Sequence, residues 1–199
     1  LFYKNNIMKI VYEKNQDKIV FDKKYKFFFK NKLLNSYFHN VYSDFNEVVL
    51  LEDMIDTFNH KTSEILMSNL VNLILYLEEQ KYTLSFISVS DIVIIDKIHF
   101  VFMNSSHVVP IVNNYISITS PLEKNEFLSP ELKQLKSIPS KIYFTSCYYS
   151  LATLVFYALF KVNYNTDSKE LKKIYYSKLY FFLLRCLNQD PTKRKLIFI

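Results

Sequence analysis

The sequence predicts an α+β fold, with a small β-rich part at the N-terminus followed by a mainly helical part. Short β-forming runs separated by polar clusters fill residues 7–29, whereas two segments after residue 145 are apolar around most of a helix circumference. Half of the 199 residues are hydrophobic and 17% are aromatic, which supplies a large core. We therefore expect a reduced β-rich unit at 1–52 and a helical unit at 53–199.

The first elements are expected to be short strands. The β-forming runs read "IMKIVY", "KIVF" and "YKFFF", and together they predict a meander. The "NQDK" segment can turn without glycine, because Asn and Asp tolerate the backbone angles of tight turns. A further apolar run, Val48–Leu51, predicts a buried strand.

A long helix is expected next. Thr62 and Ser63 are expected to cap its N-terminus, and it should run to about Gln80. Its apolar residues recur every three or four positions and predict one buried face, made of Leu66, Leu70, Leu73, Ile74 and Leu77.

The rest of the chain predicts two strands, a long irregular segment and two buried helices. The strands are Ile92–Ile95 and His99–Met103. Four prolines interrupt Asn104–Ser140, so we expect this segment to be mostly irregular. The helices are Tyr148–Phe160 and Ile174–Leu187, since both are apolar on nearly every side.

Composition limits the classes of function. The formal charge is +6, but the chain is rich in Lys, Asn, Ile, Phe and Tyr and contains no glycine, so composition bias explains part of that charge. The two cysteines have no disulfide or metal spacing, which favours a reducing intracellular setting. The longest apolar helical run is shorter than the ~20 residues that a membrane span needs. The four histidines show no ligand spacing and are expected to be ordinary polar residues.

Several segments resemble, in order, the motifs of protein kinases. The resemblance covers residues 46–194 and begins with a hinge-like stretch, "NEVVLLEDMIDT". The catalytic loop and the metal-binding strand have counterparts in "LSFISVSDIVII" and "FVFMNSS". The end of the activation segment and two C-lobe helices have counterparts in "FLSPEL", "SCYYSLATLVFYALF" and "LLRCLNQDPTKR". The resemblance implies a kinase-like fold with a reduced β-rich N-lobe and a mainly helical C-lobe.

The same resemblance implies that the chemistry is lost. Phe86 stands at the position of the catalytic aspartate, and a phenyl ring cannot accept a proton. Asp91 stands at the position of the metal-binding asparagine and Asn104 at that of the metal-binding aspartate. The phosphate cradle of a kinase also needs glycine, which is absent. We therefore expect a pseudokinase, not an enzyme, without a cofactor.

Asp91 and Asn104 allow a second interpretation. They lie 13 positions apart and both carry oxygen ligands, so a weak Mg²⁺ or Ca²⁺ site is conceivable. One carboxylate and one amide make a poor site, however. We favour structural roles, in which Asp91 caps a turn and Asn104 satisfies the loop backbone, and the sequence thus predicts no metal site.

Glu131 and Arg194 stand at positions that, in kinases, form a buried ion pair between the activation segment and the helical lobe. Removal of one member of a buried ion pair leaves the other charge uncompensated and destabilises the fold. The presence of both residues therefore implies a retained architecture. Cys147 replaces the aspartate that opens the long buried helix and braces the catalytic loop. A small buried thiol suits that position once no catalytic loop has to be aligned.

Three hypotheses of function follow. The first is a catalytically inactive kinase-like protein that acts through protein partners, as a scaffold or a structural component. Its amino-acid composition, which suggests an A/T-rich genome, and its short N-lobe resemble those of kinase-like proteins from large DNA viruses. This resemblance implies an intracellular location such as a viral factory or a virion. The second is a nucleic-acid-binding accessory protein that uses the lysine-rich N-terminus, although a solvated strand face is favoured there. The third is an unconventional nucleotide-binding enzyme that uses Asp91 and Asn104.

Overall fold

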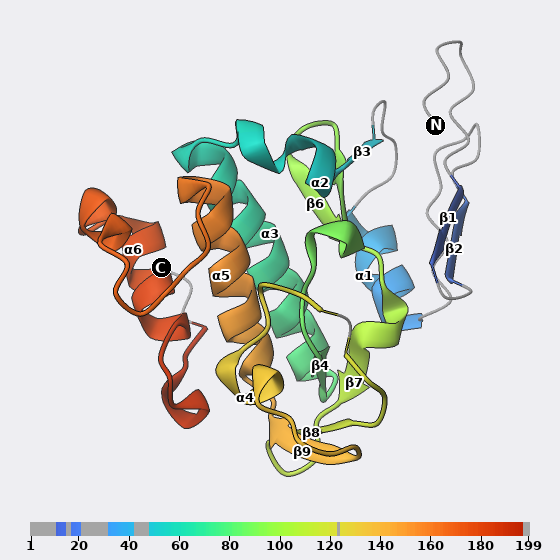
Figure 1. Ribbon diagram of the computed structural model, residues 1–199. Helices are drawn as coiled ribbons and strands as arrows, with labels where there is room; N and C mark the ends of the chain where they lie inside the picture. Colours follow the sequence, from blue (N-terminus) through green and yellow to red (C-terminus); the bar gives the residue numbers. More distant parts are fainter. Residues whose placement is uncertain (1–10, 15–16, 21–31, 42–47, 123, 197–199) are drawn as a thin grey trace.

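The computed structural model describes residues 11–14, 17–20, 32–41, 48–122 and 124–196, and all structural statements refer to these residues. The fold is a mixture of helices and small antiparallel sheets (Figure 1), as the sequence predicts at that level. The predicted "YKFFF" strand, most of "IMKIVY" at its start and part of the "NQDK" turn lie outside the described residues.

The strands are short, and each pairs with an antiparallel neighbour. They are β1 (Val11–Lys14), β2 (Asp17–Val20), β3 (Val48–Leu50), β4 (Tyr82–Leu84), β5 (Ile92–Ile95), β6 (His99–Phe102), β7 (Val108–Pro110), β8 (Tyr115–Ile118) and β9 (Ser140–Tyr143). The helices are α1 (Lys32–Val41), α2 (Leu51–Met54), α3 (His60–Glu79), α4 (Pro130–Lys133), α5 (Ser146–Phe160) and α6 (Lys178–Cys186). Single 3-10 turns include Val89–Asp91, Ser105–His107 and Pro191–Lys193.

The central sheet has the strand order β3-β5-β6. The predicted strands at 92–95 and 99–103 form its β5–β6 hairpin, and Val48 of β3 pairs with Ile95 of β5. Thus β3 lies before the boundary predicted at residue 52, while its partner strand lies after it. Leu34 and Phe38 of α1 also belong to the same core as α3 and α5. One hydrophobic core therefore spans the two predicted units.

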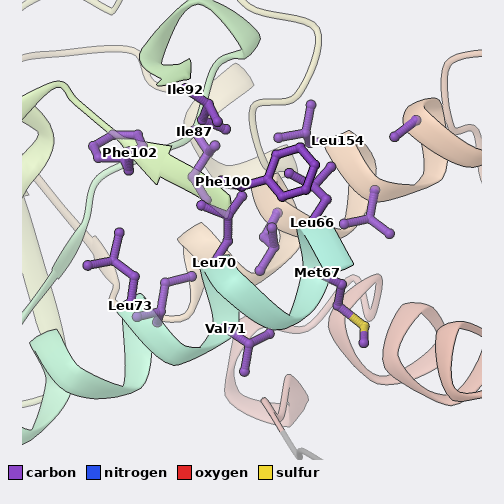
Figure 2. Close-up of a cluster of buried hydrophobic side chains, with 14 of the residues drawn as sticks. Leu66, Met67, Leu70, Val71, Leu73, Ile87, Ile92, Phe100, Phe102 and Leu154 are labelled. Atoms are coloured by element: carbon purple, nitrogen blue, oxygen red, sulfur yellow. The ribbon is translucent and has the colours of Figure 1, made fainter. Parts of the chain in front are cut away.

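Helix α3 is the central element of that core. Its predicted apolar face is confirmed, because all five of the residues named for it are buried. Figure 2 shows Leu70 facing Phe100 and Ile87 across this face. The predicted cap is wrong: the N-cap is Asn59, three residues before Thr62, and its side chain accepts a hydrogen bond from Thr62 N at 3.0 Å. Asparagine is among the best N-cap residues, and Thr62 lies inside the first turn.

Helices α5 and α6 complete the helical layer, with α5 between α3 and α6 (Figure 1). Helix α5 is buried over most of its surface, as predicted. Helix α6 begins at Lys178 rather than at Ile174, because Tyr176 has a left-handed backbone (φ 64°) that a right-handed helix cannot contain. Ser177 then caps the new helix through its hydroxyl, which accepts from Tyr180 N.

The segment between Asn104 and Ser140 is more regular than predicted. Strand β7 pairs with β4, and β8 pairs with β9, so the expectation of a mostly irregular segment is wrong for residues 108–118. Helix α1 was not expected from the sequence either. Among the described residues, no helix is both long enough and apolar enough to cross a membrane.

Candidate functional site

Phe86 lies in the loop that follows β4, where its ring is almost fully buried (3% exposed). The ring belongs to a small apolar cluster that also contains Ile116, Leu128 and Ile142. Its centroid lies 4.1 Å from that of the His107 imidazole. Packing thus holds the aromatic ring in place among apolar neighbours.

Asp91 and Asn104 contact each other directly. Asn104 Nδ2 donates to Asp91 Oδ1 at 2.8 Å, and Asn104 Oδ1 accepts from the amide and the hydroxyl of Ser106. Asn104 therefore satisfies the loop backbone, as the structural interpretation predicts. Asp91 does not cap a turn, because its carboxylate is directed at Asn104 and at His107 instead.

This arrangement does not suit a divalent cation. The side-chain oxygen of Asn104 already accepts two hydrogen bonds, and the amide nitrogen rather than the oxygen faces Asp91. A cation would need both oxygens turned toward one point, together with several further oxygen ligands. Among the described residues, no group of three or more His, Cys, Asp or Glu side chains is placed to hold a metal ion.

His107 lies between Ser85 and Asp91, although no spacing in the sequence marks it as a site residue. Its Nδ1 lies 3.2 Å from Ser85 Oγ, and its Nε2 lies 3.7 Å from Asp91 Oδ2. A hydroxyl, an imidazole and a carboxylate thus follow one another, but the second contact is too long for a hydrogen bond. Ser85 is only 5% exposed, which leaves its hydroxyl little access to a substrate. The series suits positioning of the loop better than nucleophilic catalysis.

The loop that contains Phe86 is braced from α5. Ser150 Oγ accepts from Ile87 N at 2.9 Å and lies 3.2 Å from Ile87 O, which also accepts from Asn125 Nδ2. Cys147, in contrast, contacts the Thr83 hydroxyl at 3.1 Å. The bracing contact therefore comes from Ser150, nearly one helical turn after Cys147, and sequence reasoning missed it.

Glu131 and Arg194 form a two-point ion pair. Arg194 Nη1 donates to Glu131 Oε1, and Arg194 Nη2 donates to Glu131 Oε2 at 3.0 Å. The guanidinium is fully buried, the carboxylate is 19% exposed, and Arg194 Nε also donates to Asn188 O at 2.7 Å. Burial by itself would raise the pKa of Glu131, but the hydrogen bonds and charge of Arg194 lower that pKa below its ordinary 4.5. The pair joins α4 to the chain beyond α6.

A broad groove of about 610 Å³ lies beside this pair, along α4 and the segments that flank it. Leucine side chains form its apolar lining, namely Leu122, Leu128, Leu132 and Leu135. Lys124, Lys133 and Lys136 contribute three exposed ammonium groups. None of the described residues that line the groove carries a carboxylate. A largely apolar surface with three lysines at its rim therefore lies along α4.

Comparison with known proteins identifies no family. No family model matches the chain, and no curated protein is detectably similar to it in sequence. The lysine-rich N-terminus, on which the nucleic-acid hypothesis depends, lies largely outside the described residues.

Proposed function

We propose that the chain is a kinase-like protein that has lost phosphoryl transfer and acts as a scaffold by binding another protein. Two observations support the kinase-like part. Phe86 lies in a braced loop after a short strand, at the position that the resemblance gives to the proton acceptor. Glu131 and Arg194 lie in contact across 63 residues of sequence, as the resemblance requires.

The groove beside α4 carries the binding part of the proposal. Its leucines offer an apolar surface and its three lysines a positive rim, so the partner that fits is an acidic segment with large apolar side chains. Lys133 Nζ donates to the backbone carbonyl of Glu126, which positions the ammonium group without neutralising its charge. A partner carboxylate would supply the missing counter-charge, and leucine or phenylalanine side chains would cover the apolar floor.

The loss of catalysis is tested by titration with Mg²⁺ and ATP. We expect no saturable rise in melting temperature and no transfer of labelled phosphate to the protein or to generic substrates. Ligands that bind only the folded state raise its stability by mass action, so even weak nucleotide binding would register. A saturable rise would favour the nucleotide-binding alternative and overturn this part of the proposal.

The binding part is tested with a charge-reversed groove, Lys124→Glu, Lys133→Glu and Lys136→Glu. Labelled peptides that alternate Glu with Leu or Phe should bind the wild-type chain and lose at least about tenfold in affinity for the variant, equivalent to about 1.4 kcal/mol. The matched control reverses three exposed lysines that line none of the cavities discussed, Lys169, Lys172 and Lys173. The control should bind the peptides with nearly unchanged affinity.

The same two variants then serve in affinity purification from native cells. A partner that is recovered with the wild type and the control, but not with the groove variant, should contain an acidic, apolar segment that binds as an isolated peptide. Equal recovery with all three proteins, or equal binding of peptides in which Glu is replaced by Lys, would contradict the assignment of the groove.

A further inference from the structure

A second cavity, of about 390 Å³, lies between α3 and α6, away from Phe86 and from the groove. It is lined only by these two helices. Its residues from α3 lie between Lys61 and Val71, and those from α6 lie between Lys178 and Arg185. A volume of this order falls within the ~300–1,000 Å³ range of small-molecule sites.

The cavity is strongly biased toward positive charge. Lys61, Lys178 and Arg185 contribute three cationic groups to its lining, whereas Glu64 is the single acidic residue there. The Glu64 carboxylate also lies 3.8 Å from His60 Nδ1, so its interactions are shared with a residue outside the cavity. An anion that entered the space between the two helices would meet an excess of positive charge.

Arg185 provides a separate indication of an anionic ligand. Its Nη1 is screened from solvent and has no hydrogen-bond partner. A buried donor without a partner is destabilising, and a charged one more so, so such groups call for an explanation. The guanidinium is also the side chain best shaped to bind carboxylate or phosphate through two parallel hydrogen bonds. Arg185 also lines the cavity, so its guanidinium lies where an anion in that space could meet it.

Apart from Ser68 and Asn69, the remaining lining is apolar. Phe181 and Phe182 contribute aromatic rings from α6, and Ile65, Met67 and Val71 contribute aliphatic groups from α3. Figure 2 shows Met67 and Val71 on the side of α3 opposite to Phe100, so these residues do not face the central sheet. The charged groups and the apolar groups together suit a ligand that has an anionic end and an apolar end.

We propose that the cavity between α3 and α6 binds a small organic anion, whose carboxylate or phosphate is held by Arg185 and Lys178 and whose apolar part packs on Phe181 and Phe182. Lys61 adds charge at the N-terminal end of α3. This site is independent of the proposed partner groove, since the two cavities share no lining residue.

The probes for the test are hexanoate and hexyl phosphate, which separate carboxylate from phosphate recognition, with binding measured by calorimetry. Hexanol lacks the charge, and acetate and inorganic phosphate lack the apolar part. We expect one or both of the amphiphilic anions to bind saturably at one site, at least about tenfold tighter than all three controls. Binding of neither anion, or equal binding of inorganic phosphate, would overturn the proposal.

Two substitutions, Arg185→Gln and Lys178→Gln, test whether the anion binds in this cavity. Each should weaken the binding of the preferred anion at least about tenfold, whereas Lys172→Gln, on an exposed position outside the cavity, should leave it unchanged. Arg185→Gln should also leave the melting temperature of the ligand-free protein unchanged or higher, because it removes a donor that is screened from solvent and has no partner. Unchanged anion binding in both cavity variants would place the anion elsewhere and refute the site.

Discussion

The rings of Phe86 and His107 pack against each other, with centroids 4.1 Å apart. Phe86→Ala should remove this contact and leave a cavity, at a cost of about 3–5 kcal/mol in the free energy of unfolding measured with urea. Phe86→Asp should cost at least as much, because it buries an unpaired carboxylate, and it should not produce phosphoryl transfer. Val112→Ala, at an exposed position, is the control and should change stability by less than about 0.5 kcal/mol. A gain of kinase activity in Phe86→Asp would show that only one group had been lost.

The ion pair of Glu131 and Arg194 predicts a large coupling between the two side chains. Arg194→Leu and Glu131→Gln should each cost about 3–5 kcal/mol, because each leaves its partner buried without a counter-charge. Lys193→Leu is the control, since its Nζ makes only an exposed contact with Asp190. In a double-mutant cycle the two losses should fall well short of additive; strictly additive effects would contradict the pairing.

The same pair predicts a loss of stability in acid. The pKa of Glu131 is lower in the folded protein than its ordinary value of 4.5, so the folded state binds this proton less readily than the unfolded state does. The contribution of the pair is therefore complete above about pH 4.5 and is lost as the pH falls through the lower folded value. Urea unfolding between pH 3 and pH 7 should show a drop that Glu131→Gln lacks.

Glu78 predicts a pH dependence of stability opposite to that of Glu131. Its carboxylate accepts from the Tyr148 hydroxyl at 2.7 Å, but burial outweighs this hydrogen bond and raises the pKa of Glu78 above 4.5. The folded state therefore binds this proton more readily, and the resulting stability is present below pH 4.5 and is lost as the pH rises through the folded value. Glu78→Gln should be at least as stable as the wild type at pH 7 and should lose that advantage at pH 4. A clear destabilisation of Glu78→Gln at pH 7 would contradict this prediction.

The two cysteines should be chemically inert in the folded protein. Both are fully buried, and burial raises the pKa of Cys186 to about 12 and that of Cys147 further. The thiolate is the reactive form, so a disulfide reagent at pH 8 should detect no thiol in native protein and both thiols in urea. Cys147→Ser and Cys186→Ser assign any reaction to one position. Rapid labelling of native protein would show that these helices open easily.

The backbone conformation of Tyr176 predicts that its replacement by glycine stabilises the protein. It has a left-handed backbone (φ 64°), where a bulky residue costs about 1–2 kcal/mol, and its side chain is 85% exposed. Tyr176→Gly should therefore raise the free energy of unfolding by about 1 kcal/mol, after allowance for the greater entropy of glycine in the unfolded chain. Tyr175→Gly, at a neighbouring position with negative φ, should destabilise the protein. A loss of stability in both variants would contradict the prediction.

Elements with strong local patterns could be predicted from the sequence, and elements that depend on distant partners could not. Helix α5 and strands β5 and β6 are mostly apolar, so their types follow from the local sequence. The pairing of β8 with β9 joins residues more than twenty positions apart and leaves no local trace. The turn before β8 is formed by Asn113 and Asn114 with positive φ, a use of asparagine that replaces the missing glycine.

The same distinction applies to the residues of the candidate site: some could be predicted from the sequence and others could not. The resemblance led to Phe86 and to the contact between Glu131 and Arg194, because each occupies a fixed place in a series of motifs. It could not indicate His107 or Ser150, which are single polar residues without spacing. Their roles come from the packing of β4 and α5 around one loop, which only a three-dimensional arrangement reveals.

The register of β3 against β5 has a practical consequence for fragments of this chain. Strand β5 lies between β3 and β6, and all four of its residues are buried. A protein that started at residue 53 would lose β3 and turn this apolar strand into an open edge. Unprotected hydrophobic edges pair with other chains, so such a truncation should aggregate rather than yield an isolated helical lobe.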